Sequence, residues 1–290
     1  MRQPPLLTRF DPETSVNSGQ VFLWEKSGQA WYGIHADKVV KFSNQDGVLV
    51  FESFPEEKDV ERSMFRLDDD TDAIFAEIAR DPLVQKLVAS YPGLRLMRQD
   101  PVQCIISFAC ASNTNIPMIR RMLGALSRKY GQKVVADGKE FHTFPSVQAL
   151  HKTSESELRA CGLGYRAKAI KAAAGAMADG SLDLDYLKKA DYGEARAELL
   201  KVHGIGPKIA DCILLFSLDK LDAFPIDVWI ARALASHYGW LAGKKMSEKK
   251  LTGRQYIEVS EAARRYFGRY AGYAQQFLYY HMRQDAGRKW

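Results

Sequence analysis

A lysine in the first turn of an apolar helix is placed where it could act as a nucleophile. Lys208 is the second residue of the segment PKIADCILLF, at the amino end of the predicted helix. This end carries the positive pole of the helix dipole, which is unfavourable for a cation. The same field favours the neutral amine, which is the form that attacks carbon and yields a Schiff base. An exposed lysine that contacts a phosphate is the alternative, and by position alone it is the more common role. A nucleophilic role therefore needs support from a second group.

An aspartate at the start of the next helix supplies that group. In PIDVWIARALASHYGW, Pro225 fixes the entry of the chain and Asp227 falls at the N-cap position. A simple helix cap is the alternative role, and a frequent one for Asp. Only one helix and a short loop separate Asp227 from Lys208, so the chain can fold back and place both in one cleft. There the carboxylate would stabilise positive charge on a sugar while the amine attacks its anomeric carbon.

A glycine-rich turn positions the lysine. The segment LLKVHGIGPKIADCILLF, residues 199–216, predicts two apolar helices joined by a tight turn that two glycines permit. Backbone amides at the start of the second helix lack intrahelical partners, and a phosphate suits such a site. The pattern predicts a helix-hairpin-helix element at about residues 192–218 that contacts nucleic-acid backbone without reading sequence; a plain αα-hairpin is the alternative. The residues expected to contact the backbone are His203, Gly204, Ile205 and Gly206.

The wider chain predicts an α+β protein. From residue 20 to residue 52, aromatic and β-branched runs alternate with turn residues, which is typical of an antiparallel meander, and a helix follows at about residues 70–90. Beyond residue 99 nearly every segment has helical periodicity. We expect an N-terminal antiparallel β-sheet domain with flanking helices over residues 1–98. An all-α domain that carries the helix-hairpin-helix element is expected over residues 99–290.

Composition narrows the class of partner and compartment. The formal net charge is +6 and the pI is about 9.0, a mild excess that favours polyanions without requiring them. Four cysteines are scattered without a CxxC pair or a Cys/His cluster, which argues against zinc and iron–sulfur sites and favours buried free thiols. No apolar run approaches a membrane span. We expect an intracellular protein, cytoplasmic if the source is prokaryotic and nuclear if it is eukaryotic.

At this point the sequence resembles a known family. The hairpin with its lysine, followed by PIDV, is similar to the helix-hairpin-helix DNA glycosylases, and within them to the 8-oxoguanine glycosylase branch. Six stretches match that branch in the same order: residues 18–24, 95–116, 143–150, 161–170, 199–228 and 267–275. The resemblance implies a bifunctional glycosylase and lyase that acts as a monomer on duplex DNA containing 8-oxoguanine, without an organic cofactor or catalytic metal.

The resemblance also implies the role of each catalytic residue. Lys208 attacks C1′ of the damaged nucleoside and expels the base, and the resulting imine permits β-elimination of the 3′ phosphate. Asp227 stabilises the transition state, which resembles an oxocarbenium ion. Such an enzyme must take the nucleotide out of the stack, which leaves a space to be filled. Asn113 matches the residue that fills the vacated space, and Tyr165 matches the one that wedges beside the orphaned base. Without the resemblance, a helix-breaking Asn and a packed Tyr would be the ordinary interpretations.

Four further residues match the family's base-recognition set. The carbonyl of Gly19 would accept the N7–H that distinguishes 8-oxoguanine from guanine, and Gln275 would bind the Watson–Crick edge. Cys212 and Tyr279 would cover the two faces of the base. Helical spacing supports this set independently, because Lys208 and Cys212 share one helix face, as do Gln275 and Tyr279. A turn glycine and ordinary core residues are the alternatives.

The sequence departs from the pattern of the familiar animal enzymes at two positions. Met118 stands where those enzymes carry an arginine that reads the opposite cytosine, and a thioether cannot donate such hydrogen bonds. We therefore expect relaxed opposite-base preference, with Arg166 as the remaining contact. Trp229 stands where the family often has a histidine that contacts a phosphate.

Three other classes of protein share part of this pattern, and each would show different sequence features. An alkyl-base glycosylase of the same superfamily would use an aspartate like Asp227 but normally lacks the hairpin lysine. An adenine- or pyrimidine-specific relative usually carries a four-cysteine cluster near its C-terminus, whereas the last cysteine here is Cys212. A non-catalytic DNA-binding module would explain the hairpin and the basic pI, but not Lys208 together with Asp227.

Overall fold

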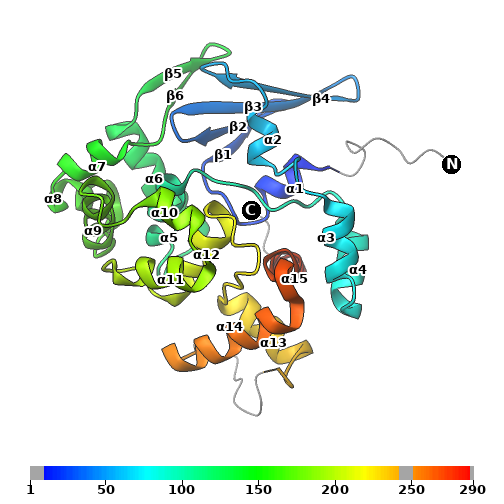
Figure 1. Cartoon of the computed structure of the whole chain (residues 1–290). Coiled ribbons are helices and arrows are strands. Elements are labelled where there is room, and N and C mark those ends of the chain that lie inside the picture. The colour runs from blue at the N-terminus through cyan, green and yellow to red at the C-terminus, as the bar shows by residue number, and fades with distance from the viewer. Residues whose placement is uncertain (1–9, 242–250, 288–290) are drawn as a thin grey trace.

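The computed structural model describes residues 10–241 and 251–287 and has the α+β architecture expected from the sequence (Figure 1). A four-stranded antiparallel sheet with the order β1-β2-β3-β4 forms its N-terminal part. Two short helices, α1 (Pro12–Val16) and α2 (Val60–Met64), flank this sheet. The strands are β1 (Trp24–Ser27), β2 (Ala30–His35), β3 (Lys38–Gln45) and β4 (Val48–Phe54).

Strands β2 and β3 are mostly buried on both faces because they lie between two cores. Successive side chains of a strand point to opposite faces. On β2, Trp31 joins a small N-terminal core with Phe42 and Phe65, whereas Tyr32 and Ile34 join the main core of the molecule. The main core continues through the helices that follow. The N-terminal sheet is thus packed directly onto the helical part of the chain.

The helix expected at about residues 70–90 is two helices. The break occurs where Pro82 lacks an N–H and its ring would clash with a carbonyl of the preceding turn. The carboxylate of Asp81 caps the second helix by accepting a 2.8 Å hydrogen bond from the amide of Val84. The single-helix expectation was therefore wrong, and the two helices are α3 (Thr71–Ile78) and α4 (Pro82–Ser90).

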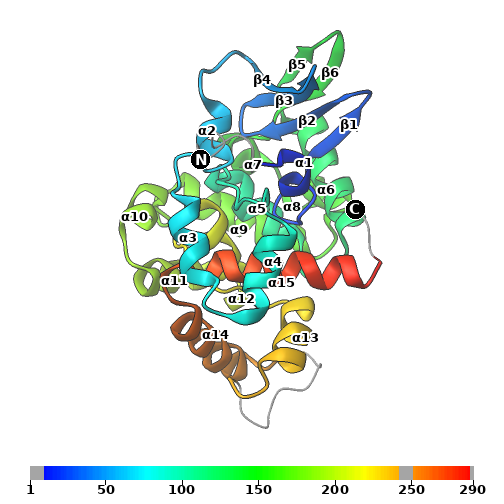
Figure 2. The same ribbon diagram turned by 90° about the vertical axis from the view of Figure 1, so that its right-hand side faces the viewer.

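Helices dominate the chain from residue 101. The first group is α5 (Pro101–Cys110), α6 (Ile116–Tyr130), α7 (Val147–Lys152), α8 (Glu155–Leu158), the π-helix η2 (Arg159–Leu163) and α9 (Arg166–Ala178). The second group is α10 (Leu184–Lys189), α11 (Tyr192–Lys201), α12 (Pro207–Ser217), α13 (Val228–His237), α14 (Gly253–Phe267), the 3₁₀ helix η4 (Gly268–Tyr270) and α15 (Ala271–Asp285). α15 crosses the middle of the molecule and packs against α3, α4, α13 and α14 (Figure 2). In the described ranges, no helix combines the length and apolarity that a membrane span requires.

A two-stranded hairpin interrupts the helical region. Its strands, β5 (Lys133–Ala136) and β6 (Lys139–His142), pair around a two-residue turn. Asp137 and Gly138 both adopt positive φ, at 49° and 73°, which is the conformation of a type I′ turn. The sequence analysis missed this hairpin, although its Asp-Gly dipeptide is a strong local signal.

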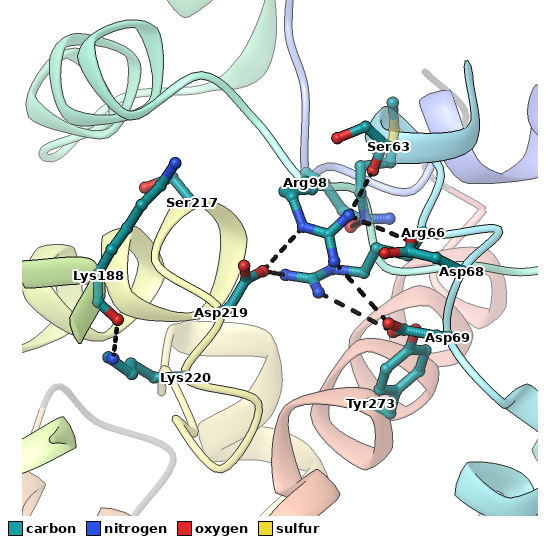
Figure 3. A network of polar contacts seen from close by, with 12 residues as sticks. Ser63, Arg66, Asp68, Asp69, Arg98, Lys188, Ser217, Asp219, Lys220 and Tyr273 are labelled. Atoms are coloured by element: carbon teal, nitrogen blue, oxygen red, sulfur yellow. Dashed lines mark hydrogen bonds and ion pairs between the residues drawn. The ribbon is translucent and has the colours of Figure 1, made fainter. Parts of the chain in front are cut away.

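A buried arginine joins the N-terminal part to the helix that carries Lys208. Arg66 lies just beyond α2, is 1% exposed and donates a 2.5 Å hydrogen bond to Asp219, which follows α12 (Figure 3). Arg98 also binds Asp219, at 3.0 Å. Asp69 accepts a hydrogen bond from Tyr273 of α15 at 2.7 Å and lies beside both arginines. These contacts fix the C-terminal end of α12 and the N-terminal end of α15 to the sheet domain.

Candidate active site

The glycine turn between α11 and α12 has the tight geometry that the sequence predicts. Gly204 adopts a φ of 89°, and a Cβ added there would overlap the Cβ of Ala169 on α9. Gly206 is the N-cap of α12 and provides no side chain to cap it. His203 and Gly204 are exposed, whereas Ile205 is buried, so Ile205 can contact DNA only through its backbone. The turn presents the amino end of α12 with its amides uncovered by a capping side chain.

Lys208 occupies the first turn of α12, as expected, and its half-buried side chain points toward Phe108 of α5. Its Nζ lies 5.3 Å from the centre of the Phe108 ring on α5 and within hydrogen-bonding reach of the Cys212 thiol one turn later. Burial raises the pKa of Cys212 to about 11, and the positive charge of Lys208 opposes that rise. Cys212 therefore stays a thiol at neutral pH. All four cysteines are buried and unpaired, as the sequence predicts.

Asp227 caps α13 and also faces Lys208. Its Oδ1 accepts hydrogen bonds of 2.9 Å from the amides of Trp229 and Ile230. Burial raises the pKa of Asp227, and the charge of Lys208 is the main influence that opposes this rise, followed by the two amides and Arg283. Lys208 and Asp227 are therefore close enough to interact as charges. The two candidate catalytic groups lie within range of each other's charge, and the capping role does not exclude the catalytic one.

Gly19 lies in a turn that buried amides hold in place. Its φ is 84°, which favours glycine. The side chain of Gln276 on α15 donates a 2.8 Å hydrogen bond to the carbonyl of Ser18. On the other side, the amide of Gln20 binds the carbonyl of Arg95, and the side chain of Gln99 binds the carbonyl of Gln20, both at 2.8 Å. The structure thus fixes the peptide group before Gly19 and both the side chain and the carbonyl of Gln20 after it, and it ties this turn to α15.

Gln275 directly precedes Gln276, whose side chain holds the Gly19 turn. The side chain of Gln275 itself faces the loop before Asp227. Its Nε2 donates a 3.2 Å hydrogen bond to the carbonyl of Pro225. Its Oε1 is buried and has no hydrogen-bond partner among the described residues. A buried acceptor without a partner costs free energy unless a ligand satisfies it. This orphaned oxygen is the strongest local indication that a ligand completes the site.

Arg283 is a site residue that the sequence analysis missed. It lies one helical turn after Tyr279 on α15, and its Nη1 is 3.3 Å from the hydroxyl of Tyr279. Its guanidinium is 6.0 Å from the centre of the Trp229 ring, and the guanidinium of Arg232 is 5.0 Å from the same centre. The four-residue spacing after Tyr279 could have indicated this position. Trp229 thus groups two cations at the start of α13.

The Asn113 loop is held by the two residues at the start of α9, Tyr165 and Arg166. Asn113 is exposed and has a φ of 48°. The carbonyl of Ser112 accepts hydrogen bonds from the Tyr165 hydroxyl at 3.0 Å and from Arg166 Nη2 at 2.6 Å, and Arg166 also binds the carbonyl of Asn113. Met118 is 39% exposed near this loop on α6. The structure therefore gathers the four residues expected at the orphaned base: Asn113, Met118, Tyr165 and Arg166.

Comparisons with known proteins assign this arrangement to a family. The model for the N-terminal domain of 8-oxoguanine DNA glycosylase matches residues 6–105. The model for HhH-GPD superfamily base excision DNA repair proteins matches residues 106–254. The chain belongs to the HhH-GPD superfamily. Within it, the chain is a DNA N-glycosylase/lyase of the 8-oxoguanine glycosylase branch.

Individual relatives agree with that placement. The N-glycosylase/DNA lyase OGG1 of Arabidopsis thaliana is 36% identical over 90% of this chain and 74% of its own length. A probable N-glycosylase/DNA lyase of Methanothermobacter thermautotrophicus is 32% identical over 73% of this chain and 70% of its own length. The 8-oxoguanine glycosylase/lyase of Clostridium acetobutylicum, solved with double-stranded DNA containing cytosine opposite to 8-oxoguanine, superposes with a TM-score of 0.87. It is 33% identical and is matched over 96% of this chain and 93% of its own.

We found no candidate metal site in the part of this glycosylase that the structure describes. Residues 10–241 and 251–287 contain no group of three or more His, Cys, Asp or Glu side chains placed to hold a metal ion. The reactive groups that the described site offers are the amine of Lys208 and the carboxylate of Asp227.

The hairpin turn of this glycosylase leads to a prediction about stability. Gly204→Ala should lower the free energy of unfolding by about 2 kcal/mol, because the residue needs a positive φ and its methyl group would overlap Ala169. Urea unfolding measures the loss. Gly206→Ala is the matched control, since its φ is −92° and a Cβ there meets no atom within 4 Å. Equal losses for the two variants would contradict the prediction.

Proposed function

We propose that this chain excises 8-oxoguanine from duplex DNA by attack of Lys208 Nζ at C1′ of the damaged nucleotide. The bond from C1′ to the base breaks, and the base departs with the bonding electrons and takes up a proton. The sugar ring opens to give an imine with Lys208. Loss of a proton from C2′ then expels the 3′ phosphate, which cuts the strand. The observation that carries the proposal is that Lys208, in the first turn of α12 after the glycine turn, interacts as a charge with the buried Asp227.

Asp227 supports the first step through its negative charge. Cleavage of the bond to the base develops positive charge on the sugar, and a carboxylate already held in place lowers the energy of that state. The amides of Trp229 and Ile230 hold the carboxylate, so it need not reorganise during the reaction. By the family resemblance, Asp227 would also assist the proton transfers that follow base loss.

Base recognition would use residues of α12, of α15 and of the Gly19 turn. The orphaned Oε1 of Gln275 can accept from the N–H groups on the Watson–Crick edge of the base. The carbonyl of Gly19 would accept the N7–H that guanine lacks. Cys212 and Tyr279 would cover the two faces. These assignments follow the family's motif and fit the fixed positions of the Gly19 turn and of Gln275.

Trapping with borohydride tests the proposal, because reduction of the imine fixes the protein to DNA. The full chain is incubated with a duplex that contains one 8-oxoguanine and, in parallel, with the same duplex carrying guanine. We expect a covalent adduct and strand cleavage with the first duplex and neither with the second. If the protein releases the base but forms no adduct, the lyase chemistry is wrong. If it does not act on the damaged duplex at all, the substrate is wrong.

Opposite-base selectivity should be weak. Met118 cannot donate hydrogen bonds to cytosine, and Arg166 is engaged by the carbonyls of Ser112 and Asn113. We expect excision rates opposite the four bases to agree within about tenfold, since one bidentate pair contributes roughly 1–3 kcal/mol of discrimination. Met118→Arg should raise the preference for cytosine. Strong cytosine selectivity in the unaltered protein would contradict this prediction, and single-turnover assays on four matched duplexes measure it.

The partner in this proposal is double-stranded DNA, and one chain contains every group that the reaction uses. We infer that the protein acts as a monomer and works where the chromosome lies, in the cytoplasm of a prokaryote or the nucleus of a eukaryote. The net charge of +6 is of the right sign for this partner. Sedimentation of the free protein and of its complex with a short duplex would test the monomer.

A further inference from the structure

Asp211 is a buried carboxylate on the same helix as Lys208 that the proposed reaction does not use. It is fully buried and lies one turn after Lys208 on α12. Its Oδ1 accepts hydrogen bonds from Tyr192 and Arg196 of α11, at 2.8 Å and 2.9 Å. Its Oδ2 accepts a separate hydrogen bond of 2.7 Å from Tyr256 of α14. A buried charge needs such partners, and these three come from the helices on either side.

The hydroxyl of Tyr256 links this carboxylate to the loop before Asp227. While it donates to Asp211, it accepts a 3.2 Å hydrogen bond from the amide of Ile226. Tyr256 is itself buried. Ile226 directly precedes Asp227. The contact therefore runs from the nucleophile's helix, through one phenol, to the backbone beside the catalytic carboxylate.

The same peptide group is held on its other side by a base-recognition residue. Gln275 Nε2 donates to the carbonyl of Pro225, and this carbonyl belongs to the peptide whose N–H binds Tyr256. The bond to Pro225 decides which end of the Gln275 amide remains for a ligand, and the end that remains is the orphaned Oε1. The orientation of one peptide thus bears on both Asp227 and Gln275.

We propose that Tyr256 is a positioning residue for the reaction: with Asp211 it fixes the Pro225–Ile226 peptide and so sets both Asp227 and the amide of Gln275. The inference rests on the proposed function. A phenylalanine at position 256 keeps the ring but frees the peptide N–H and removes one partner of Asp211. Small displacements of catalytic groups lower rates strongly, so the effect should appear in the chemical step.

The test compares two tyrosines that bind the same carboxylate. Tyr256→Phe should lower the single-turnover rate of 8-oxoguanine excision about tenfold. Its dissociation constant for a duplex with an uncleavable abasic analogue should stay within about twofold of the unaltered protein. Tyr192→Phe also removes one hydrogen bond to Asp211 but none to the Asp227 loop, so its excision rate should stay within about twofold. Urea unfolding of both variants separates a lost contact from a lost fold.

A second variant interrupts the same chain of contacts from the other end. Asp211→Asn replaces the carboxylate that Tyr256 binds with an amide, which presents either a donor or a weaker acceptor. This variant should lower the excision rate, and it should not add to the effect of Tyr256→Phe in the double variant. Equal excision rates for Tyr256→Phe and Tyr192→Phe would overturn the inference, as would a loss that lies wholly in DNA affinity. Failure of the unaltered protein to excise 8-oxoguanine would instead refute the proposed function.

Discussion

Lys208→Gln should abolish covalent trapping and lower base excision by about a thousandfold or more. The amine forms the bond to C1′, so its loss removes the intermediate itself and not only a contribution to binding. Glutamine is nearly the same length and retains a polar end group. The site around it, formed by Phe108 and Cys212, should therefore stay in place. Borohydride trapping and single-turnover excision on one 8-oxoguanine duplex measure the two losses.

Two further substitutions separate nucleophilicity from charge. Lys208→Arg keeps a cation beside Asp227, yet a guanidinium stays protonated and cannot form the imine, so trapping should again fail. Lys86→Gln makes the same change of charge at an exposed position on α4 and should leave excision unaltered. An adduct formed by Lys208→Gln would mean that another amine is the nucleophile. Full activity of Lys208→Arg would reduce Lys208 to a phosphate contact.

The sequence predicted those elements whose signals are local. The strand order follows from four apolar runs and their turns, and the hairpin follows from two glycines between apolar helices. The N-cap role of Asp227 also follows from its place after Pro225. The resemblance then located the rest of the candidate site, and the structure brings Lys208, Cys212 and Asp227 together.

Other features depend on tertiary contacts that no local pattern contains. Arg283 matters because α15 passes the start of α13, and periodicity alone does not tell which face of α15 meets Trp229. Asp211 reads as a polar residue within an apolar helix until α11 and α14 surround it. The break at Pro82 differs, since its signal was present and the helical periodicity on both sides concealed it. Periodicity finds elements, whereas the partners of buried polar groups require the fold.

Asp227→Asn should lower base excision by about a hundredfold or more with little loss of stability. Asparagine and aspartate are comparable N-caps, so the amides of Trp229 and Ile230 keep an oxygen partner. What disappears is the negative charge that would stabilise the sugar as the base departs, and removal of one such group typically costs two to three orders of magnitude. Single-turnover excision and urea unfolding on the same preparation test both halves of the prediction.

The acid limb of the pH profile provides an independent test of the same group. Burial raises the pKa of Asp227 above that of an unfolded aspartate, so the folded protein binds this proton more tightly. As the pH falls through the raised pKa, this group makes the fold more stable relative to neutral pH. Excision, which needs the carboxylate, declines over the same window. Both changes should vanish in Asp227→Asn, and an unchanged acid limb in that variant would assign the limb to another group. Opposite trends of activity and stability on lowering the pH are therefore expected for Asp227, and the decline of activity is the part that reports its catalytic role.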